Sequence, residues 1–400
     1  MSLLNELALP ACWEQFYAYK ASLVCPKEVL KELRDFIDGQ AYLPVCESIA
    51  RGDAFPLPRR AVISKMRSGK KRVVYLYPKA ENTVLKLLTW RLLRKYDTLF
   101  SDNLYSFRPG RTAKDAMRRL SHTKGLSDMH LYKVDISNYF NSVPVERLLP
   151  LLKEVLADDP PLFAFLRRLL EEPCVRDGSG IVKEEKGIMA GTPLSAFYAN
   201  LYLKELDAAF AEEGIPYFRY SDDIIVLAET KEELEARAGR IRTFLQEAGL
   251  SVNPKKEEVF APGEGFSFLG FSWKNGVIDI APATLDKLKA KMRRKTRALK
   301  RWQERNGLPG EKAAAAFIRV FNRKLLESPE GHELSWSFWF FSVINTTASL
   351  ERIDHYAQEC LRYLVSGRRT KARFHVRYED LKKLGYRSLV HAYYSFSATN

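Results

Sequence analysis

Apolar positions in the first 58 residues recur at helical spacing, as in Val29–Ile37, and Pro56-Leu57-Pro58 ends this pattern. The spacing predicts a helical N-terminal region. Residues 63–77 then hold two β-rich runs around Ser68-Gly69, which predicts a hairpin with basic residues at its tip. We expect a helix to follow over residues 80–99.

Two further apolar, β-rich segments each lie beside acidic residues. Leu131–Ile136 carries a single aspartate, Asp135, near its end, and Asp222-Asp223 directly precedes the apolar run Ile224–Leu227. Side chains on a strand alternate between faces, so one of the paired acids can point squarely at a shared site. If the two strands lie side by side, all three carboxylates come within a few ångströms of one another.

Carboxylates that close repel one another, and their pKa values rise unless cations neutralise them. Mg²⁺ prefers hard oxygen ligands and is normally held by one or two carboxylates together with substrate phosphates. The pattern therefore predicts a phosphoryl-transfer site in which Asp135, Asp222 and Asp223 hold two Mg²⁺ ions roughly 3.5 to 4 Å apart. Mn²⁺ is the alternative metal.

The chain beyond Pro282 is predicted to be helical and basic. A basic amphipathic helix should extend over residues 285–305, and further helices over residues 312–326 and 349–365. The aromatic cluster at residues 336–341 fits either a packed helical core or a base-stacking platform, and we favour the core. No mechanism is predicted for residues 386–394.

Composition and charge favour a phosphate-rich partner. Lys and Arg number 64 against 49 Asp and Glu, a formal net charge of +15. The five cysteines are scattered and form no Cys-x-x-Cys pair, which argues against a zinc site or a disulfide framework. Membrane-length apolar runs and a signal peptide are absent, so we expect a cytoplasmic protein with no membrane contact. Motifs of P-loop NTPases, Gly-x-Ser-x-Gly hydrolases and His-x-x-x-His metalloproteases are also absent.

Tyr220-Ser221-Asp222-Asp223 resembles the Tyr-x-Asp-Asp box of reverse transcriptases, and Asp135 resembles the first catalytic aspartate of that family. Five other blocks resemble the family, in the family's order: residues 63–72, 105–111, 187–207, 249–256 and 268–271. An ordered series of this kind is far more specific than an isolated Asp-Asp pair. Two positions depart from the pattern: Ala190 stands where the family usually has Gln, and Ser106 where many bacterial members have Gly.

The resemblance implies roles for further residues. The nucleotide would be bound by Lys65, Arg72, Phe140, Ala190, Gly191 and Lys256. The ring of Phe140 would leave no space for a 2′-hydroxyl and so would select dNTPs over rNTPs. The primer 3′ end would be gripped by Phe268-Leu269-Gly270. Nucleic-acid backbone would be bound by the basic residues Arg108, Arg111, Lys287, Lys291, Arg294, Arg368 and Arg369.

The fold implied by the resemblance is of the α+β class, a right-hand polymerase. It would have fingers and a palm, with an antiparallel palm sheet flanked by helices, and an all-helical thumb. We expect a helical N-terminal extension over residues 1–58, fingers with part of the palm over 59–130, the palm with its catalytic aspartates and primer grip over 131–280, and a basic thumb over 281–400. No length remains after this thumb for a nuclease domain.

The implied activity is that of an RNA-directed DNA polymerase that adds dNTPs to a primer 3′ end. Its expected partners are an RNA template, which we interpret as a structured non-coding RNA, dNTPs and the DNA product. By resemblance to group II intron-like, retron and defence-associated bacterial enzymes, we expect a role in anti-phage defence. Two alternatives stay open: an intron maturase-like RNA-binding protein with a vestigial polymerase, and an RNA-dependent RNA polymerase. Template identity, priming mode and oligomeric state also stay open.

Overall fold

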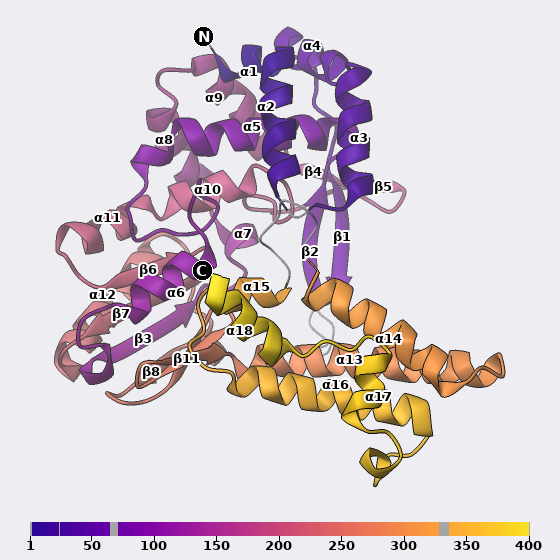
Figure 1. Cartoon of the computed structure of the whole chain (residues 1–400). Helices are drawn as coiled ribbons and strands as arrows, with labels where there is room; N and C mark the ends of the chain where they lie inside the picture. Colours follow the sequence, from indigo (N-terminus) through magenta and orange to yellow (C-terminus); the bar gives the residue numbers. More distant parts are fainter. Residues whose placement is uncertain (1, 24, 65–70, 328–335, 400) are drawn as a thin grey trace. The chain divides into compact units, whose positions relative to one another are not determined.

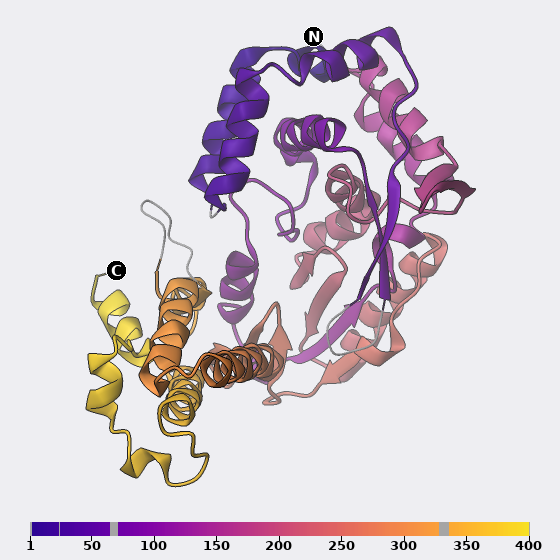
Figure 2. The ribbon, with the colours of Figure 1, turned by 90° about the vertical axis from the view of Figure 1, so that its right-hand side faces the viewer.

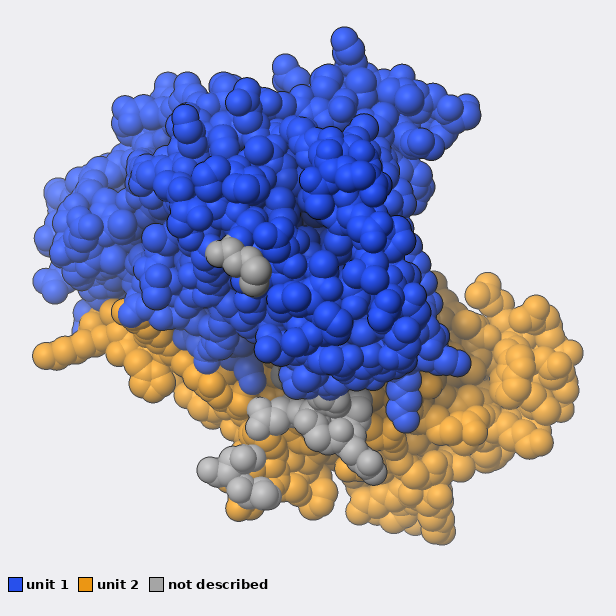
Figure 3. Space-filling view, turned by 90° about the horizontal axis from the view of Figure 1, so that it is seen from above, with its two compact units in different colours: residues 1–116, 128–262 blue, residues 117–127, 263–400 orange. Residues whose placement is uncertain are grey.

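The computed structural model describes residues 2–23, 25–64, 71–327 and 336–399. The chain divides into two compact units, one of residues 1–116 and 128–262, the other of residues 117–127 and 263–400 (Figure 3). Both units combine helices with sheets that are almost wholly antiparallel, as expected for the α+β class. Within the described ranges, no helix is both long enough and apolar enough to cross a membrane.

Four helices open the first unit, as the spacing of apolar residues predicted (Figure 1, indigo). They are α1 (Leu3–Glu6), α2 (Pro10–Ser22), α3 (Lys27–Asp38) and α4 (Leu43–Arg51). Trp13 of α2 is buried among them, with its ring centroid 4.8 Å from that of Tyr42. Its indole N–H donates to the carbonyl of Leu7 at 2.7 Å. The ring therefore adds buried apolar area without leaving a polar atom unpaired.

The predicted hairpin is confirmed. Strand β1 (Arg59–Ser64) pairs antiparallel with β2 (Lys71–Leu76), while Lys65 and the other residues of the tip, 65–70, lie outside the described residues. Strands β4 (Cys174–Asp177) and β5 (Gly180–Lys183) extend the sheet in the order β2-β1-β4-β5. The helix expected after the hairpin is present as α5 (Lys79–Lys95), followed by the 3₁₀ helix η1 (Asp97–Leu99).

A second sheet of the first unit has the strand order β6-β7-β3-β8, with every neighbour antiparallel. Its strands are β3 (His130–Asp135), β6 (Tyr217–Tyr220), β7 (Asp223–Ala228) and β8 (Glu258–Phe260). Strand β7 is buried from Ile224 to Ala228, and α12 (Lys231–Glu247) packs on both β7 and β3. An uninterrupted apolar run suits a strand that has no face turned to water.

The chain between residues 96 and 265 holds further helical elements. They are α6 (Ala113–Ser121), η2 (Leu126–Asp128), α7 (Tyr139–Ser142), α8 (Val145–Val155), α9 (Pro160–Glu171), α10 (Ser195–Tyr202), α11 (Lys204–Glu212) and η3 (Pro254–Lys256), of which α6 and η2 lie partly in the second unit. Helix α10 contacts α5, α7, α8 and α11, and seven of its eight residues are buried. A helix that is apolar on all sides belongs in the interior of a unit, and α10 lies in the core of the first unit.

The second unit begins with a three-stranded antiparallel sheet in the order β11-β10-β9. Its strands are β9 (Phe266–Phe268), β10 (Phe271–Lys274) and β11 (Val277–Ile280). Helices α13 (Pro282–Arg305), α14 (Gly310–Leu325) and α16 (Ala348–Ser366) then pack against one another in pairs (Figure 2). These three helices lie close to the bounds that the sequence predicted.

Short helices complete the second unit: α15 (Trp336–Phe341), η4 (Ala372–Phe374), α17 (Tyr378–Lys383) and α18 (Leu389–Thr399). Two residues of the aromatic cluster, Phe340 and Phe341, are buried. Phe340 contacts Phe271, with ring centroids 5.1 Å apart, and Phe341 contacts Tyr393 at 5.3 Å. The packed-core interpretation is confirmed for these two residues. The division of the chain into fingers, palm and thumb stays a prediction.

Candidate active site

The acidic turn joins β6 and β7, two neighbouring strands of the β6-β7-β3-β8 sheet. Strand β6 ends at Tyr220 and β7 begins at Asp223, so Ser221 and Asp222 form the turn between them. Ser221 adopts a left-handed backbone conformation with φ of 60°, which a small polar residue tolerates better than a β-branched one. The register places Asp135, the last residue of β3, directly opposite Asp223. The backbone N–H of Ile136 donates to the carbonyl of Asp222 at 3.0 Å.

Asp135 and Asp222 line one cavity of about 410 Å³ in the first unit. Burial raises the pKa of Asp222, and the negative charge of Asp135 adds to the effect. Burial, followed by the charges of Asp222 and Asp135, raises the pKa of Asp223 to about 6. Asp223 is not among the residues that line the cavity. The expectation that one member of the Asp222-Asp223 pair faces the shared site agrees with this geometry.

The carboxylate of Asp135 has two partners in this structure. The ammonium of Lys256 forms an ion pair with one of its oxygens, and the amide of Asn253 donates to the other at 3.1 Å. The backbone also converges here, because the N–H of Asn253 donates to the carbonyl of Asp135 at 2.8 Å. Asn253, which the sequence reasoning did not single out, therefore orients the first acid.

The donor set of this cavity suits a divalent cation. Two carboxylates, those of Asp135 and Asp222, line it, and their oxygens are ligands that a divalent cation prefers. A cation there would offset the burial and the charge of Asp135 that raise the pKa of Asp222. Across the described ranges, no group of three or more His, Cys, Asp or Glu residues is arranged to hold a metal ion. Asp135 and Asp222 are the pair that shares the cavity, while Asp223 pairs with Asp135 in the sheet and feels the charges of both acids. The role of all three as metal ligands stays a prediction.

Phe140 forms part of the wall of the same cavity. Its backbone carbonyl accepts from the N–H of Ile188 at 2.8 Å, and its ring meets Phe107 edge to face with centroids 6.4 Å apart. Gly187 makes this approach possible, since a Cβ there would lie 2.7 Å from the carbonyl oxygen of Phe140. The glycine serves close backbone packing here.

Ala190 and Gly191 lie against strand β2. The N–H of Ala190 is accepted by the side-chain oxygen of Asn141 at 2.9 Å, and its carbonyl accepts from the N–H of Tyr75 at 2.8 Å. Gly191 has a φ of 97°, and a Cβ there would lie 3.0 Å from Val74. Arg72 of β2 and Ala190 both line the acidic cavity. The structure thus brings these parts of the predicted nucleotide site together with the acids.

Arg108 does not fit its predicted role. Its side chain is buried, with the guanidinium bonded to the carboxylate of Asp97 at 2.8 Å and to the backbone carbonyls of Ser101, Leu104 and Asp97. Every donor direction points into the protein, so a contact with nucleic-acid phosphates is contradicted by the geometry. Arg108 instead holds the segment before α6 in place. Arg111, which is less buried, forms an ion pair with Asp102.

The other predicted residues belong to the second unit. Phe268 ends β9, and Leu269 and Gly270 form the turn into β10, both with positive φ. Lys287, Lys291 and Arg294 are exposed on α13 at spacings of four and three residues, which places them on one face of the helix. Arg368 and Arg369 are exposed, and the guanidinium of Arg369 lies 5.1 Å from the ring centroid of Tyr363. Their roles stay predictions.

A buried polar network bonds to the backbone of the acidic turn. Arg219 and Asp207 are both fully buried and form a bidentate ion pair, with N–O distances of 2.7 and 2.5 Å. The same guanidinium donates to the carbonyl of Ser221 at 3.3 Å and to that of Asn200 at 3.3 Å. Burial opposes the charge on Arg219, but Asp207 attracts it more, and the net effect raises the pKa of the guanidinium.

Ser106 completes this network. Its hydroxyl oxygen accepts from the N–H of Ser221 at 2.9 Å, and the hydroxyl donates to the side chain of Asn200 at 3.2 Å. The side-chain amide of Asn200 donates in turn to the carbonyl of Ser106 at 2.8 Å. The sequence marked Ser106 only as a departure from the glycine of many bacterial members. The structure shows its hydroxyl bonded to the backbone of the acidic turn.

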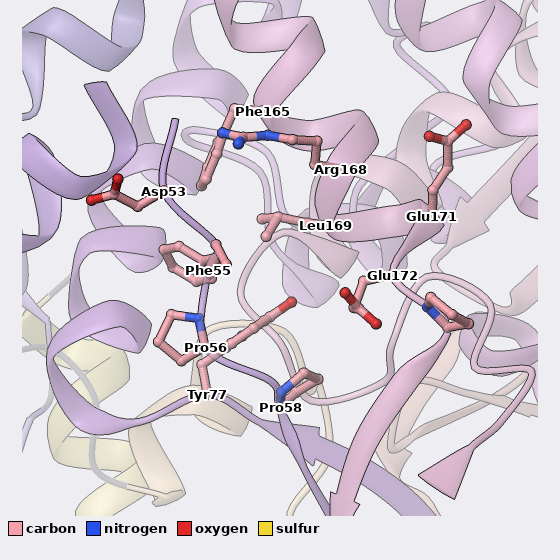
Figure 4. Close-up of a pocket in the computed structure, with 12 residues that line it drawn as sticks. Asp53, Phe55, Pro56, Pro58, Tyr77, Phe165, Arg168, Leu169, Glu171 and Glu172 are labelled. Carbon is pink, nitrogen blue, oxygen red and sulfur yellow. The ribbon is translucent and has the colours of Figure 1, made fainter. Parts of the chain in front are cut away.

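A second cavity of the first unit, of about 390 Å³, is lined mostly by aromatic, proline and acidic residues (Figure 4). Three aromatic rings, those of Phe55, Tyr77 and Phe165, form one side of it. Its charged lining residues are Asp53, Arg168, Glu171 and Glu172, so three carboxylates outweigh one guanidinium and disfavour a phosphate. It shares no lining residue with the cavity of Asp135 and Asp222.

Comparison with known proteins supplies the context for this geometry. The family model described as "Reverse transcriptase (RNA-dependent DNA polymerase)" matches residues 63–273. The "Uncharacterized 91 kDa protein in cob intron" of Schizosaccharomyces pombe is 28% identical over 174 residues, which cover 42% of this chain and 20% of that protein. "Protein YkfC" of Escherichia coli is 21% identical over 263 residues, which cover 56% of this chain and 68% of that protein.

Among solved structures, apo telomerase from Candida tropicalis is similar with a TM-score of 0.48 and 12% identity. The likeness covers 83% of this chain and 69% of that one. The chain spans only about a fifth of the length of the Schizosaccharomyces pombe relative.

Removal of the Asp207 charge tests the support of the turn. We expect Asp207→Asn to lower the free energy of unfolding by about 3–5 kcal/mol, because the buried guanidinium of Arg219 would be left without its counter-charge. Thermal and urea unfolding measure the loss. Glu213→Gln is the matched control, since the ion pair of Glu213 with Arg240 is exposed and screened by water. Equal melting temperatures for the two variants would contradict the role of the buried pair.

Proposed function

The chain belongs to the reverse transcriptase (RNA-dependent DNA polymerase) family, whose model spans residues 63–273, and on this premise we propose that it extends a primer 3′ end with dNTPs on an RNA template. The observation that carries the proposal is the cavity in which Asp135 and Asp222 face Arg72, Phe140 and Lys256. Nucleotidyl transfer requires carboxylates that bind cations, positively charged side chains that bind phosphates, and a surface that contacts the sugar. This cavity holds all three.

Divalent ions are part of the proposal. Asp135 and Asp222 would hold them, and Asp223 would support the turn or complete the ligand set. We propose two Mg²⁺, with Mn²⁺ as the alternative. Once bound, such ions activate the attacking hydroxyl and neutralise the charge that develops on the phosphates. Lys256 bonds to Asp135 in this structure, and it would be free to turn to a phosphate when a cation takes its place at the carboxylate.

The chain's own residues would position the nucleotide. Arg72 is exposed at the edge of β2 and lines the cavity, so it can reach the triphosphate. Lys65, which lies outside the described residues, is proposed to act with it. Asn141 and Ala190 fix the floor through the bond between the Asn141 side chain and the Ala190 N–H. Alanine at position 190 brings no side-chain amide to the nucleotide, so its contact there would be made by the backbone alone.

Three further groups of residues are proposed to bind the nucleic acid. Phe268, Leu269 and Gly270 would grip the primer end. The exposed face of α13 with Lys287, Lys291 and Arg294 would track phosphates, as would Arg368 and Arg369. Phosphate contacts of this kind carry no sequence information but hold the strand in register.

We place this activity in bacterial anti-phage defence, with a dedicated structured non-coding RNA as template and a cytoplasmic location. The proposal is supported by the resemblance of the motifs to bacterial enzymes and by the similarity to a protein of Escherichia coli. Sequencing of the nucleic acid that copurifies with the protein, before and after dNTP addition, should identify one RNA and its DNA copy. A mixture of unrelated RNAs would count against a dedicated template.

An intron maturase-like protein with a vestigial polymerase is the second candidate. Similarity to a Schizosaccharomyces pombe protein named for the cob intron favours it. The cavity argues for the enzyme instead, because both of its acids and the facing Arg72 are in place. An RNA-dependent RNA polymerase would share the acids but would gain nothing from the ring of Phe140 beside the sugar.

The activity itself is tested by Asp222→Asn. We expect primer extension on a primed RNA template to fall at least about 100-fold, because the loss of a metal-binding carboxylate removes several kcal/mol of transition-state stabilisation. Single-turnover extension with dNTPs measures the rate. Asp158→Asn serves as control, since Asp158 pairs with Lys95 at the surface and lines no part of the cavity. Undiminished extension by Asp222→Asn would exclude the proposed site.

Sugar selection is tested by Phe140→Ala. Removal of the ring should open space for the 2′-hydroxyl, so we expect the efficiency of rNTP incorporation relative to dNTP to rise at least about tenfold. Steady-state kcat/KM for matched dNTP and rNTP pairs gives the ratio. Phe107→Ala is the control, because Phe107 contacts Phe140 but does not line the cavity. An unchanged ratio in Phe140→Ala would eliminate the steric gate.

A further inference from the structure

A hollow of about 1140 Å³ lies in the second unit, and the proposed reaction makes no use of it. Helices α17 and α18 (Figure 1, yellow) and the segment between them supply most of its lining residues, and Phe338 of α15 contributes one. It shares no lining residue with the cavity of Asp135 and Asp222. Its volume exceeds the roughly 300–1,000 Å³ of small-molecule sites, so a segment of a polymer fits it better than a metabolite.

Aromatic rings line this hollow. Tyr394 is 60% exposed although it is a large aromatic residue, and Tyr378 is half-buried. The rings of Phe338 and Phe396 lie with centroids 5.5 Å apart, and Phe341 packs against both of them. The inner rings thus form a packed aromatic layer, whereas Tyr394 keeps much of its surface in water. An exposed flat ring supported by a packed aromatic layer is suited to stacking with nucleobases.

The charge of the hollow has one sign. Lys382 and Arg387 are exposed on its lining, and the ammonium of Lys382 lies 4.9 Å from the ring centroid of Tyr378. As far as the structure describes the chain, no aspartate or glutamate lines the hollow, although the protein has 49 acidic residues. Cations beside aromatic rings, without a carboxylate, attract a phosphate backbone whose bases are unpaired.

The wall is held in shape by one buried carboxylate. Asp354 of α16 accepts from the hydroxyls of Tyr386 and Ser388 at 2.7 and 2.6 Å, and from the backbone N–H groups of Leu389 and Val390 at 2.9 and 3.1 Å. Both oxygens of Asp354 are therefore bonded at the first turn of α18. A carboxylate at a helix N-terminus is stabilised by the helix dipole as well. Segment 386–390 is thereby anchored at the side of the hollow.

We propose that this hollow binds an unpaired segment of RNA, with bases stacked on Tyr394 and Tyr378 and phosphates bound by Lys382 and Arg387. The assignment rests on the proposed function, because RNA is the template that the proposed enzyme must hold during synthesis. The hollow would retain the RNA at a point separate from the polymerase cavity. It accounts for residues 386–394, for which the sequence offered no mechanism.

The test measures binding of a fluorescein-labelled ten-nucleotide oligoadenylate to the full chain, after the polymerase cavity has been saturated with an unlabelled primed hairpin. We expect Tyr394→Leu to weaken binding about tenfold, the loss typical of one stacked base. Phe374→Leu should bind like the wild type, since Phe374 is 67% exposed but lies outside the hollow. Oligoadenylate carrying a photoreactive base should crosslink to residues 386–396.

Charge contributes a second, independent readout. Arg387→Gln and Lys382→Gln should each reduce the slope of log Kd against log salt by about 0.7, the value for one phosphate contact with a single strand. Lys383→Gln should leave the slope unchanged, because Lys383 neighbours Lys382 on α17 but does not line the hollow. Tyr394→Leu should weaken binding and keep the wild-type slope.

Several results would overturn the proposal: wild-type binding by Tyr394→Leu, crosslinks confined to residues 128–262, tighter binding of the same-length DNA, or binding of an acidic peptide in place of the RNA. Extension of the primed hairpin is measured on the same preparations. Normal extension together with an inert hollow would reject this inference alone. Oligoadenylate binding without extension would reject the polymerase function and leave the hollow.

Discussion

The buried ion pair between Arg219 and Asp207 is the interaction on which the candidate active site depends. Two full charges stay in the interior because each satisfies the other and because the guanidinium also bonds the carbonyls of Asn200 and Ser221. Pairs of this kind add little net stability compared with apolar residues, yet they permit few alternative geometries. Here the guanidinium bonds the carbonyl of Ser221 in the turn, and the carbonyl of Asp222 accepts from the N–H of Ile136, just beyond the end of β3.

The site that this support holds is electrostatically strained. Asp135 and Asp222 share a cavity, where burial and the charge of Asp135 raise the pKa of Asp222, and in this structure Lys256 forms an ion pair with Asp135. A cation bound by the carboxylates would neutralise their negative charge, and a phosphate beside the basic side chains would neutralise their positive charge. The formal net charge of the whole chain is +15, and a polyanionic partner would neutralise this positive charge in the same way.

Aromatic residues serve two physical roles in this chain, and burial separates them. Phe340 and Phe341 lie in the core of the second unit, where their area stabilises the helices, while Tyr394 keeps its ring in water at the hollow. Phe140 lies between these cases, with its backbone fixed by Ile188 and its ring in a cavity wall. The same residue type thus packs in a core or keeps its ring exposed according to what lies over its face, and the exposed rings are the ones proposed to contact a ligand.

Local pattern was sufficient to predict the helices of the N-terminal region, the hairpin of β1 and β2, the strand after Asp223 and the three long helices of the second unit. Each of these elements depends on the spacing of apolar residues, a property of neighbours in the chain. The acids were found in the same way, since an aspartate at the end of an apolar run is visible in the sequence.

Only the tertiary structure decided which hydrogen-bond and ion-pair partners meet across large separations in the chain. Arg108 looks like a phosphate ligand until its burial against Asp97 is seen, and Ser106 looks neutral until its hydroxyl is found on the N–H of Ser221, 115 residues away. The support of Arg219 by Asp207 and the anchor at Asp354 were likewise invisible. The physical reason is that hydrogen bonding and burial are properties of position in space, and the apolar pattern along the chain determines which face turns inward but not which polar groups then come together.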